Sequence, residues 1–179
     1  MLRPELEQRL RRHLKPTNKS WRVDETYVRV KGRWCYLYQA IDSKGATIDL
    51  LLSAWRDADA AKRLFRKALS DRSHPRVINT DLAPIYSSAI PDSKKEGTLR
   101  HRCRHRPVQY LNNILEQDHR AIQRRVNAKQ GFREFQAARR TMQGYEAVHR
   151  IRKGQIRWVA GDDLPRQIKF IDGLFDLAA

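Results

Sequence analysis

The chain has 179 residues, is 40% hydrophobic and carries a formal net charge of +17 at pH 7. This length and apolar content predict one folded domain with its own core and exclude a disordered or low-complexity chain. The positive charge favours an anionic partner, with nucleic acid first among the candidates. No apolar stretch resembles a signal peptide or a membrane span, so no membrane partner is expected. The two cysteines form no disulfide framework, which suits a reducing cytosol.

The first third of the chain predicts a short charged helix followed by three strands. Residues 21–30, W-R-V-D-E-T-Y-V-R-V, are rich in β-branched and aromatic side chains, which is typical of a strand. Lys31-Gly32 and Ser43-Lys44-Gly45 predict hairpin turns that lead into further strands at 33–42 and 46–54. Three consecutive strands with tight turns should form an antiparallel meander.

The middle of the chain predicts helices that alternate with short strands. Apolar residues recur at helical spacing between 58 and 69, and Asp57 is the expected N-cap of that helix. Residues 76–81, R-V-I-N-T-D, are a candidate for a short buried strand, and a second helix is expected to begin within 83–90. The basic segment 99–108 alternates like a strand but is also compatible with an extended loop.

Two long helices are then expected, at 111–128 and 132–153, on either side of Gly131. The second carries an apolar stripe that predicts a core-facing side, made of Phe135, Ala138, Met142, Tyr145 and Val148. The predicted order βββαβα(β)αα combines an antiparallel meander with a later strand reached through a helix. It therefore predicts an α/β fold, a mixed sheet covered by helices.

Several familiar sites are absent from the sequence. It has no G-x-x-x-x-G-K-[ST], G-x-G-x-x-G or G-x-S-x-G motif, so neither a nucleotide-binding loop nor a nucleophile elbow is supported. His101, Cys103 and His105 alternate in H-R-C-R-H and could share one face of a strand. No second Cys/His pair with zinc-ligand spacing completes a tetrahedral site, so zinc is a minor hypothesis.

Three acids are the stronger candidates for chemistry. Asp24 lies inside a predicted strand, where Asp is disfavoured, Asp81 ends another, and Glu116 is on a predicted helix. Carboxylates from three elements could hold two divalent ions for phosphoryl displacement, and Mg²⁺ prefers such oxygen ligands. Strand acids can also be edge residues, and helical glutamates are usually solvated. The rival carboxylates that periodicity does not exclude are Asp42, Asp49 and Asp118.

Three local strings carry a resemblance to a known family. They are W-R-V-D-E-T-Y-V-R-V-K-G-R-W at 21–34, V-I-N-T-D at 77–81 and H-R-P-V-Q-Y-L-N-N-I-L-E-Q-D-H-R at 105–120. With their spacing, they resemble insertion-sequence transposases of the DDE, ribonuclease H-like superfamily, specifically the insertion-sequence-six family of bacterial mobile elements. The resemblance runs from H-L-K-P-T-N near the start to I-R-K-G-Q-I-R-W at 151–158.

The resemblance implies a ribonuclease H-like mixed sheet, with the antiparallel three-strand meander plus parallel strands, flanked by helices. It implies that Asp24, Asp81 and Glu116 are the catalytic, metal-binding triad. The implied enzyme is a DDE transposase that uses two Mg²⁺ ions, or Mn²⁺. It hydrolyses a phosphodiester at the element's end and then joins the free 3′-hydroxyl to target DNA. No covalent protein intermediate is needed.

Basic and polar residues around Glu116 are expected to hold the DNA backbone. On a helix, Arg120 and Arg124 lie one and two turns beyond Glu116, on nearly the same face. Phosphate contacts of this kind position DNA without reading its sequence, although a solvated basic face would show the same pattern. The expected DNA-binding residues are Arg106, Arg120, Gln123, Arg124, Arg125 and Lys129.

The chain also departs from the family pattern. Relatives usually have Lys at the position of Gln123, and often Lys directly after the second aspartate, where this chain has Leu82. Family members usually carry an upstream helix-turn-helix, and this chain begins near the junction after it, so an N-terminally truncated copy is expected. The expected domains are an N-terminal helical remnant at 1–19, the catalytic core at 20–155 and a tail at 156–179.

The main functional hypothesis is therefore a transposase catalytic domain acting on element ends and target DNA. It is expected to work as a homo-oligomer on DNA, in the bacterial cytoplasm and associated with the nucleoid. The alternative is a catalytically impaired, DNA-binding remnant that regulates or inhibits a full-length transposase. A ribonuclease H-type nuclease acting on another nucleic acid is a third, weaker hypothesis.

Overall fold

The computed structural model describes residues 3–71, 74–109, 119–120, 123 and 131–176. The chain divides into two compact units, which are described separately below. The first unit combines Met1–Pro16 with Arg139–Ala179, and the second is Thr17–Ala138. The second unit contains the whole sheet and all three motifs that carry the family resemblance.

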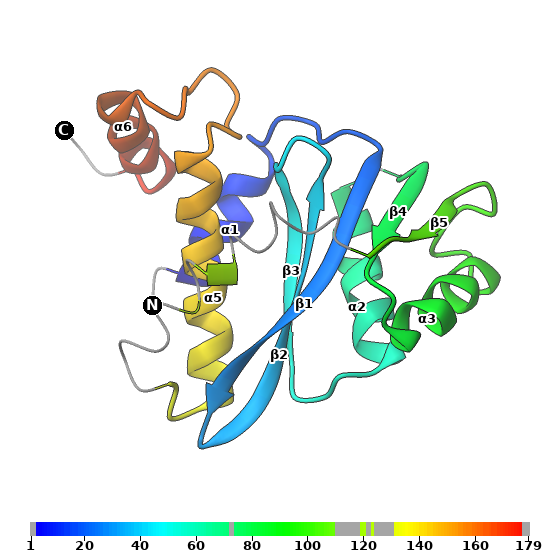
Figure 1. Ribbon diagram of the computed structural model, residues 1–179. Helices are drawn as coiled ribbons and strands as arrows, with labels where there is room; N and C mark the ends of the chain where they lie inside the picture. The colour runs from blue at the N-terminus through cyan, green and yellow to red at the C-terminus, as the bar shows by residue number, and fades with distance from the viewer. Residues whose placement is uncertain (1–2, 72–73, 110–118, 121–122, 124–130, 177–179) are drawn as a thin grey trace. The chain divides into compact units, whose positions relative to one another are not determined.

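The predicted antiparallel meander is confirmed. Strands β1 (Ser20–Val30), β2 (Arg33–Asp42) and β3 (Thr47–Ser53) pair in sequence order, as Figure 1 shows. Lys31 and Gly32 form the first turn with positive φ angles of 51° and 73°. Two positive φ values give the turn a backbone twist that matches the flanking strands, which is why a Gly is favoured there.

Two parallel strands complete the five-stranded sheet, whose order is β3-β2-β1-β4-β5. Strand β4 (Val77–Thr80) pairs in parallel with β1, and β5 (Arg104–Pro107) pairs in parallel with β4. The basic segment that was compatible with a strand or a loop therefore contributes the edge strand. The mixed, helix-flanked sheet predicted from the sequence is confirmed.

Helices α2 (Ala58–Ala68) and α3 (Pro84–Lys95) pack side by side and share one core with the sheet. This core takes alternate residues of β1, because successive strand side chains point to opposite faces. Its largest fully buried members include Trp21, Tyr38, Leu64, Phe65, Ile78, Tyr86 and Ile90. Asp57 caps α2 as predicted, its carboxylate accepting a hydrogen bond from the Ala60 amide at 2.7 Å.

The chain is tied to the sheet on both sides of the segment that carries Glu116. After β5, the Val108 amide donates to the Thr80 carbonyl at 2.9 Å. Further on, the Phe132 amide donates to the Arg29 carbonyl at 3.0 Å. Gly131, with a φ of +89°, makes this return possible, because a Cβ there would lie 2.8 Å from the Arg29 carbonyl oxygen. The helix expected at 111–128 falls mostly outside the described residues, although His119 is helical.

The other unit is helical, with a small core of its own. It contains α1 (Arg3–Arg11), most of α5 (Phe135–Arg152) and α6 (Leu164–Leu174). Its buried apolar residues are Leu10, Ala147, Ile151, Ile156, Val159 and Leu174. The expected tail thus contains a helix that the sequence reading did not identify. The proposed domain boundaries stay a prediction. None of the helices in the described part of the chain is long and apolar enough to cross a membrane.

The predicted apolar stripe of α5 was only partly right. Ala138 and Met142 are buried, Phe135 and Tyr145 are half-buried, and Val148 is 41% exposed. The second half of the helix instead buries Ala147 and Ile151. The reason is geometric: nine residues at about 100° each place Ala147 half a turn around the helix from Ala138. The two ends of α5 therefore bury different faces, which a single stripe does not describe.

Candidate metal and nucleic-acid site

Two of the three predicted acids lie together where the parallel pairing of β1 with β4 ends. Val23 of β1 pairs with Thr80 of β4, so the next residues along the chain, Asp24 and Asp81, are brought side by side. Together with Glu25 they form a group in which one carboxylate oxygen of each residue lies within 4.8 Å of the others. The carboxyl ends of parallel strands are the usual place for a ligand-binding crevice in such sheets.

The electrostatics of this group are unfavourable without a cation. Burial, with the charges of Glu25 and Asp81, raises the pKa of Asp24 to about 7. A hydrogen bond of 2.8 Å from the Glu25 amide to Asp24 Oδ1 acts in the opposite direction. Asp81 is oriented by the Ala83 amide, which donates to its Oδ1 at 3.0 Å. Because Mg²⁺ and similar ions take carboxylate oxygens, the donor set fits a divalent cation.

Glu25 belongs to the cluster but is already engaged by other side chains. Arg56 forms an ion pair with its Oε1, with the guanidinium Nε 2.6 Å away, and the Tyr86 hydroxyl donates to its Oε2. The Glu25 side chain is only 3% exposed. Burial, with the charge of Glu25, raises the pKa of Tyr86 well above its ordinary value, so this phenol stays a donor. Glu25 is therefore better suited to hold the site's shape than to ligate an ion.

Sequence reasoning missed Glu25. Neighbouring residues in a strand point to opposite faces, so once Asp24 was selected the alternation argued against its neighbour. Along β1 the buried residues switch from Trp21 and Val23 to Thr26 and Val28, and the two acids lie where that switch occurs. The adjacent acids in W-R-V-D-E-T were the available signal.

The predicted sites downstream of β5 are only partly described. Glu116, Arg124, Arg125 and Lys129 lie outside the described residues, so their roles stay predictions. Arg120 is exposed, and Arg106 is an exposed residue of β5. The Gln123 side chain donates to Thr26 Oγ1 at 2.8 Å, two residues beyond Asp24. In this structure the glutamine amide contacts the sheet beside the acids.

The rival carboxylates have other partners. Asp42 accepts hydrogen bonds from the amides of Asn18, Lys44 and Ala46, which organises the second hairpin turn. Buried Asp49 forms an ion pair with Lys67 at 2.7 Å. Asp118 lies outside the described residues. Leu82, at the position where relatives often have Lys, is 59% exposed.

The minor zinc hypothesis gains no support from the structure. The acidic trio is the one group of potential metal ligands found among the residues the structure describes. His101, Cys103 and His105 do not converge there: Cys103 is buried, His101 is exposed, and a ring nitrogen of His105 lies 2.9 Å from Thr80 Oγ1.

Comparison with known proteins agrees with this geometry. The protein family described as "DDE domain" matches residues 18–155. The chain is 37% identical over 133 residues to the Staphylococcus aureus "Transposase for insertion sequence-like element IS431mec", covering 74% of this chain and 58% of that protein. The same values hold for the Staphylococcus aureus "Transposase for insertion sequence element IS257 in transposon Tn4003". The chain thus spans 58% of the length of these curated relatives.

Solved structures show the same fold at low sequence identity. The HTLV-2 integrase catalytic core domain in complex with magnesium (trimeric form) has a TM-score of 0.57 at 16% identity, over 79% of this chain and 95% of that one. The BIV integrase catalytic core domain has a TM-score of 0.54 at 16% identity, over 89% and 99%. The fold is therefore ribonuclease H-like, as predicted. With the family match over most of its length, the chain belongs to the DDE-domain family of insertion-sequence transposases.

Proposed function

We propose that this chain cuts and joins DNA phosphodiesters as the catalytic domain of an insertion-sequence transposase. The observation that carries the proposal is the convergence of Asp24 and Asp81, whose carboxylate oxygens lie within 4.8 Å of each other and of Glu25. These are the two acids that the sequence motifs singled out. They come from separate motifs, which the parallel pairing of β1 with β4 brings together.

Asp24 and Asp81 are the proposed ligands of the divalent ions, with Glu116 as the third. The proposed cofactor is a pair of Mg²⁺ ions, which Mn²⁺ can replace. When bound, such ions neutralise charge on the phosphoryl oxygens and on the entering and leaving oxygens. The burial and mutual repulsion of the acids support this assignment, because a cation would relieve both.

The described residues on either side of Glu116 support its inclusion. Val108 is hydrogen-bonded to Thr80, the neighbour of Asp81, and Gln123 is hydrogen-bonded to Thr26, two residues beyond Asp24. In the sequence, Glu116 therefore lies between one residue that is hydrogen-bonded beside Asp81 and another that is hydrogen-bonded close to Asp24. A glutamate within that segment is well placed in the chain to complete a three-carboxylate site.

The chain's own residues would orient the acids and the substrate. Arg56 and the Tyr86 hydroxyl fix Glu25, which in turn restricts the carboxylates beside it. Arg106 and Arg120 are exposed, and their guanidinium groups would contact phosphate oxygens and position the backbone without reading sequence. A carboxylate cluster leaves attack on phosphorus to water and then to a DNA 3′-hydroxyl, so no covalent protein intermediate is required.

The proposed partners are the element's ends, target DNA and further copies of this chain on that DNA. Association with the nucleoid would follow from DNA binding. The strong positive charge of the chain supports nucleic acid as the partner class.

Cleavage of a supercoiled plasmid carrying the element's ends tests the function. Wild-type protein should nick it with Mg²⁺ or Mn²⁺ but not with EDTA. Asp24→Asn, Asp81→Asn and Glu116→Gln should each reduce the rate by about 1000-fold, since metal ions contribute several kcal/mol to such reactions. The matched control is Asp59→Asn, which removes an exposed carboxylate on α2 and should cleave like wild type.

Strand transfer is tested with a duplex that ends in a free 3′-hydroxyl, mixed with target plasmid.

Undiminished nicking by Asp81→Asn would overturn the proposed chemistry. DNA binding without cleavage under any divalent metal would instead identify a regulator, the alternative raised by the sequence.

A further inference from the structure

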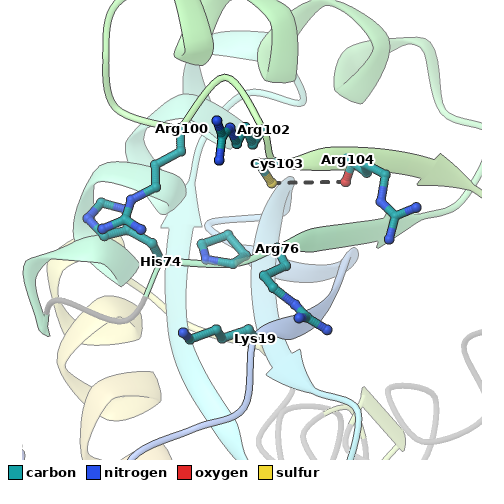
Figure 2. Close-up of a pocket in the computed structure, with 8 residues that line it drawn as sticks. Lys19, His74, Arg76, Arg100, Arg102, Cys103 and Arg104 are labelled. Carbon is teal, nitrogen blue, oxygen red and sulfur yellow. Dashed lines mark hydrogen bonds between the residues drawn. The ribbon is translucent and has the colours of Figure 1, made fainter.

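We infer that a second DNA-backbone site lies at the opposite end of the parallel strands from the carboxylates. A cavity of about 470 Å³ opens there, and its lining is strongly basic. Figure 2 shows the side chains around it, and we call the site the basic pocket: five cations, Lys19, Arg76, Arg100, Arg102 and Arg104, together with His74. The inference rests on the proposed function insofar as the polyanion is DNA, but it concerns residues that this function does not use.

Backbone hydrogen bonds place three of these cations in a row. The Arg76 amide donates to the Lys19 carbonyl at 2.8 Å, and the Arg104 amide donates to the Arg76 carbonyl at 2.9 Å. Each residue begins or directly precedes a strand, so the row crosses the amino ends of β1, β4 and β5. Neighbouring strands lie about 4.8 Å apart, so the row spans roughly 10 Å of backbone.

A turn just before β5 adds two more cations. The Cys103 amide donates to the Arg100 carbonyl at 2.9 Å, which closes a turn containing Arg102. The Cys103 side chain is buried beneath this turn, with its Sγ 3.9 Å from the Arg104 carbonyl oxygen (Figure 2). A buried anchor thus holds Arg100, Arg102 and Arg104 along the same rim.

The charges of the basic pocket have no acid to neutralise them in the part of the chain that the structure describes. Lys19, Arg76, Arg100, Arg102 and Arg104 are all exposed, and the ion pairs found among described residues involve none of them. His74 adds a buried Nδ1 without a hydrogen-bond partner among those residues. Gathering five like charges is unfavourable unless an anion binds, so the arrangement favours a ligand with several negative groups.

A phosphodiester backbone fits this pattern better than a single phosphate. The cations are spread over three strands and a turn rather than focused on one point, and DNA presents one phosphate per 3.4 Å of each strand. The pocket is also separate from the carboxylates. The four residues of β4 separate Arg76 from Asp81, and these five steps along the strand at about 3.3 Å each come to about 16 Å. A duplex contacting the basic pocket would therefore be held well away from the acids.

The test compares two double variants that remove the same charge. Arg102→Gln/Arg104→Gln alters the basic pocket, and Arg33→Gln/Arg66→Gln removes two exposed arginines that do not line it. Binding of a fluorescent 30-base-pair duplex is measured in EDTA from 50 to 300 mM KCl, in an Asp81→Asn background so that no cleavage occurs. Thermal unfolding and circular dichroism check that each variant folds.

The pocket variant should bind at least about 10-fold more weakly than the control at 100 mM salt. The slope of log affinity against log salt should fall by about 2, because each lost phosphate contact contributes about 0.9. A second pair, Lys19→Gln/Arg76→Gln, should behave in the same way and replaces the first if that variant does not fold. Equal affinities and slopes for pocket and control variants would overturn the inference.

A further arm distinguishes DNA from free phosphate. If 10 mM inorganic phosphate at constant ionic strength abolishes the difference between pocket and control variants, the pocket is a small-anion site and the inference is wrong. Persistence of the difference supports it. The two proposals can fail independently. Loss of plasmid nicking in the acid variants tests the role of the carboxylates, whereas the salt dependence of duplex binding in EDTA tests only the basic pocket.

Discussion

Like charges lie close together at both ends of the parallel pairing of β1 with β4, but different interactions hold them in place at each end. Where the parallel pairing of β1 with β4 ends, one carboxylate oxygen each of Asp24, Glu25 and Asp81 lies within 4.8 Å of the others, and the almost fully buried Glu25 side chain is fixed by Arg56 and Tyr86. At the amino ends, the cations of the basic pocket are exposed, and the hydrogen bonds found for them among the described residues hold their backbones. One end is organised by side chains and the other by the hydrogen bonds of the sheet.

This difference indicates what each end requires. Buried acids need a compact cation that reaches several oxygens at once, so their geometry must be set before binding. Exposed arginines keep their hydration and rotamer freedom until a polyanion arrives, so only their spacing needs to be set. The two ends should therefore respond differently to metal, to substitution and to pH.

The largest expected difference concerns Mg²⁺. At a free Mg²⁺ concentration 100 times its Kd, the free energy of unfolding of the wild type should rise by about 2.7 kcal/mol. Asp24→Asn and Asp81→Asn should lose most of this gain, whereas Arg102→Gln/Arg104→Gln should keep it. Differential scanning calorimetry with MgCl₂ or an equal ionic strength of KCl measures the effect. Loss of the gain in the arginine variant would remove the proposed distinction between the two ends.

The next effect is on stability without metal. Glu25→Gln should lower the free energy of unfolding by about 2 kcal/mol, because it weakens hydrogen bonds to a buried carboxylate. Arg104→Gln should change it by no more than about 0.5 kcal/mol, as expected for an exposed residue. Urea unfolding measures both. Glu96→Gln is the matched control, since Glu96 pairs with Lys62 with 42% of its side chain exposed. Equal losses of unfolding free energy in Glu25→Gln and Glu96→Gln would show that the ion pair between Arg56 and Glu25 does not stabilise the fold.

Asp24→Asn should change the free energy of unfolding by less than Glu25→Gln does, and with the opposite sign. In EDTA at pH 8, above the Asp24 pKa of about 7, the wild type carries a half-buried charge beside two other acids. Removing it should raise the free energy of unfolding by on the order of 1 kcal/mol after allowance for solvent screening, or about 2–4 °C in Tm. Asp59→Asn controls for the loss of one negative charge. A destabilised Asp24→Asn would mean that its hydrogen bonds outweigh the repulsion.

The smallest expected effect involves His105, which lies on β5 between the two ends. Burial and the charge of Lys94 lower the pKa of His105, whose ring is hydrogen-bonded to the Thr80 hydroxyl. The unfolded state therefore binds more protons at this site near and below the usual histidine pKa, so His105 contributes a loss of stability as the pH falls from 7.5 through 6. Asp24, whose pKa is raised to about 7, contributes with the opposite sign in the same window, so the effect of His105 is measured as the difference between wild type and His105→Gln in the pH dependence of urea unfolding. The variant should gain stability relative to wild type as the pH falls, and an unchanged pH dependence would contradict the assignment.

The sheet was largely predictable from the sequence because its signals are local. Alternation and the turn at Lys31-Gly32 define the meander, and the Asp57 cap defines the start of α2. Helix α6 was not recognised, and the stripe of α5 was misplaced at Val148. In both cases burial depends on which neighbour covers which part of the helix, and periodicity alone does not contain that information.

The site was predictable in part for the same reason. The resemblance selected Asp24 and Asp81 through their flanking residues, and parallel pairing then brought them together. Glu25 was missed because its partners, Arg56 and Tyr86, are remote in sequence. The basic pocket was missed although Arg100, Arg102 and Arg104 belong to the basic segment 99–108. Only the strand order places Lys19 and Arg76 beside them.

The backbone row Lys19–Arg76–Arg104 has a consequence for the folding of the sheet. Arg76 precedes Val77, the register partner of both Ser20 and Arg104, so slipping either parallel pairing by one residue would shift one of these cations along the strands by about 3.3 Å relative to the others. Correct register of both pairings is therefore needed to assemble the pocket. Such pairings join distant parts of the chain and are expected to form slowly. DNA that binds only the assembled pocket would stabilise molecules whose strands pair in the correct register. It would therefore shift the equilibrium away from molecules with slipped strands.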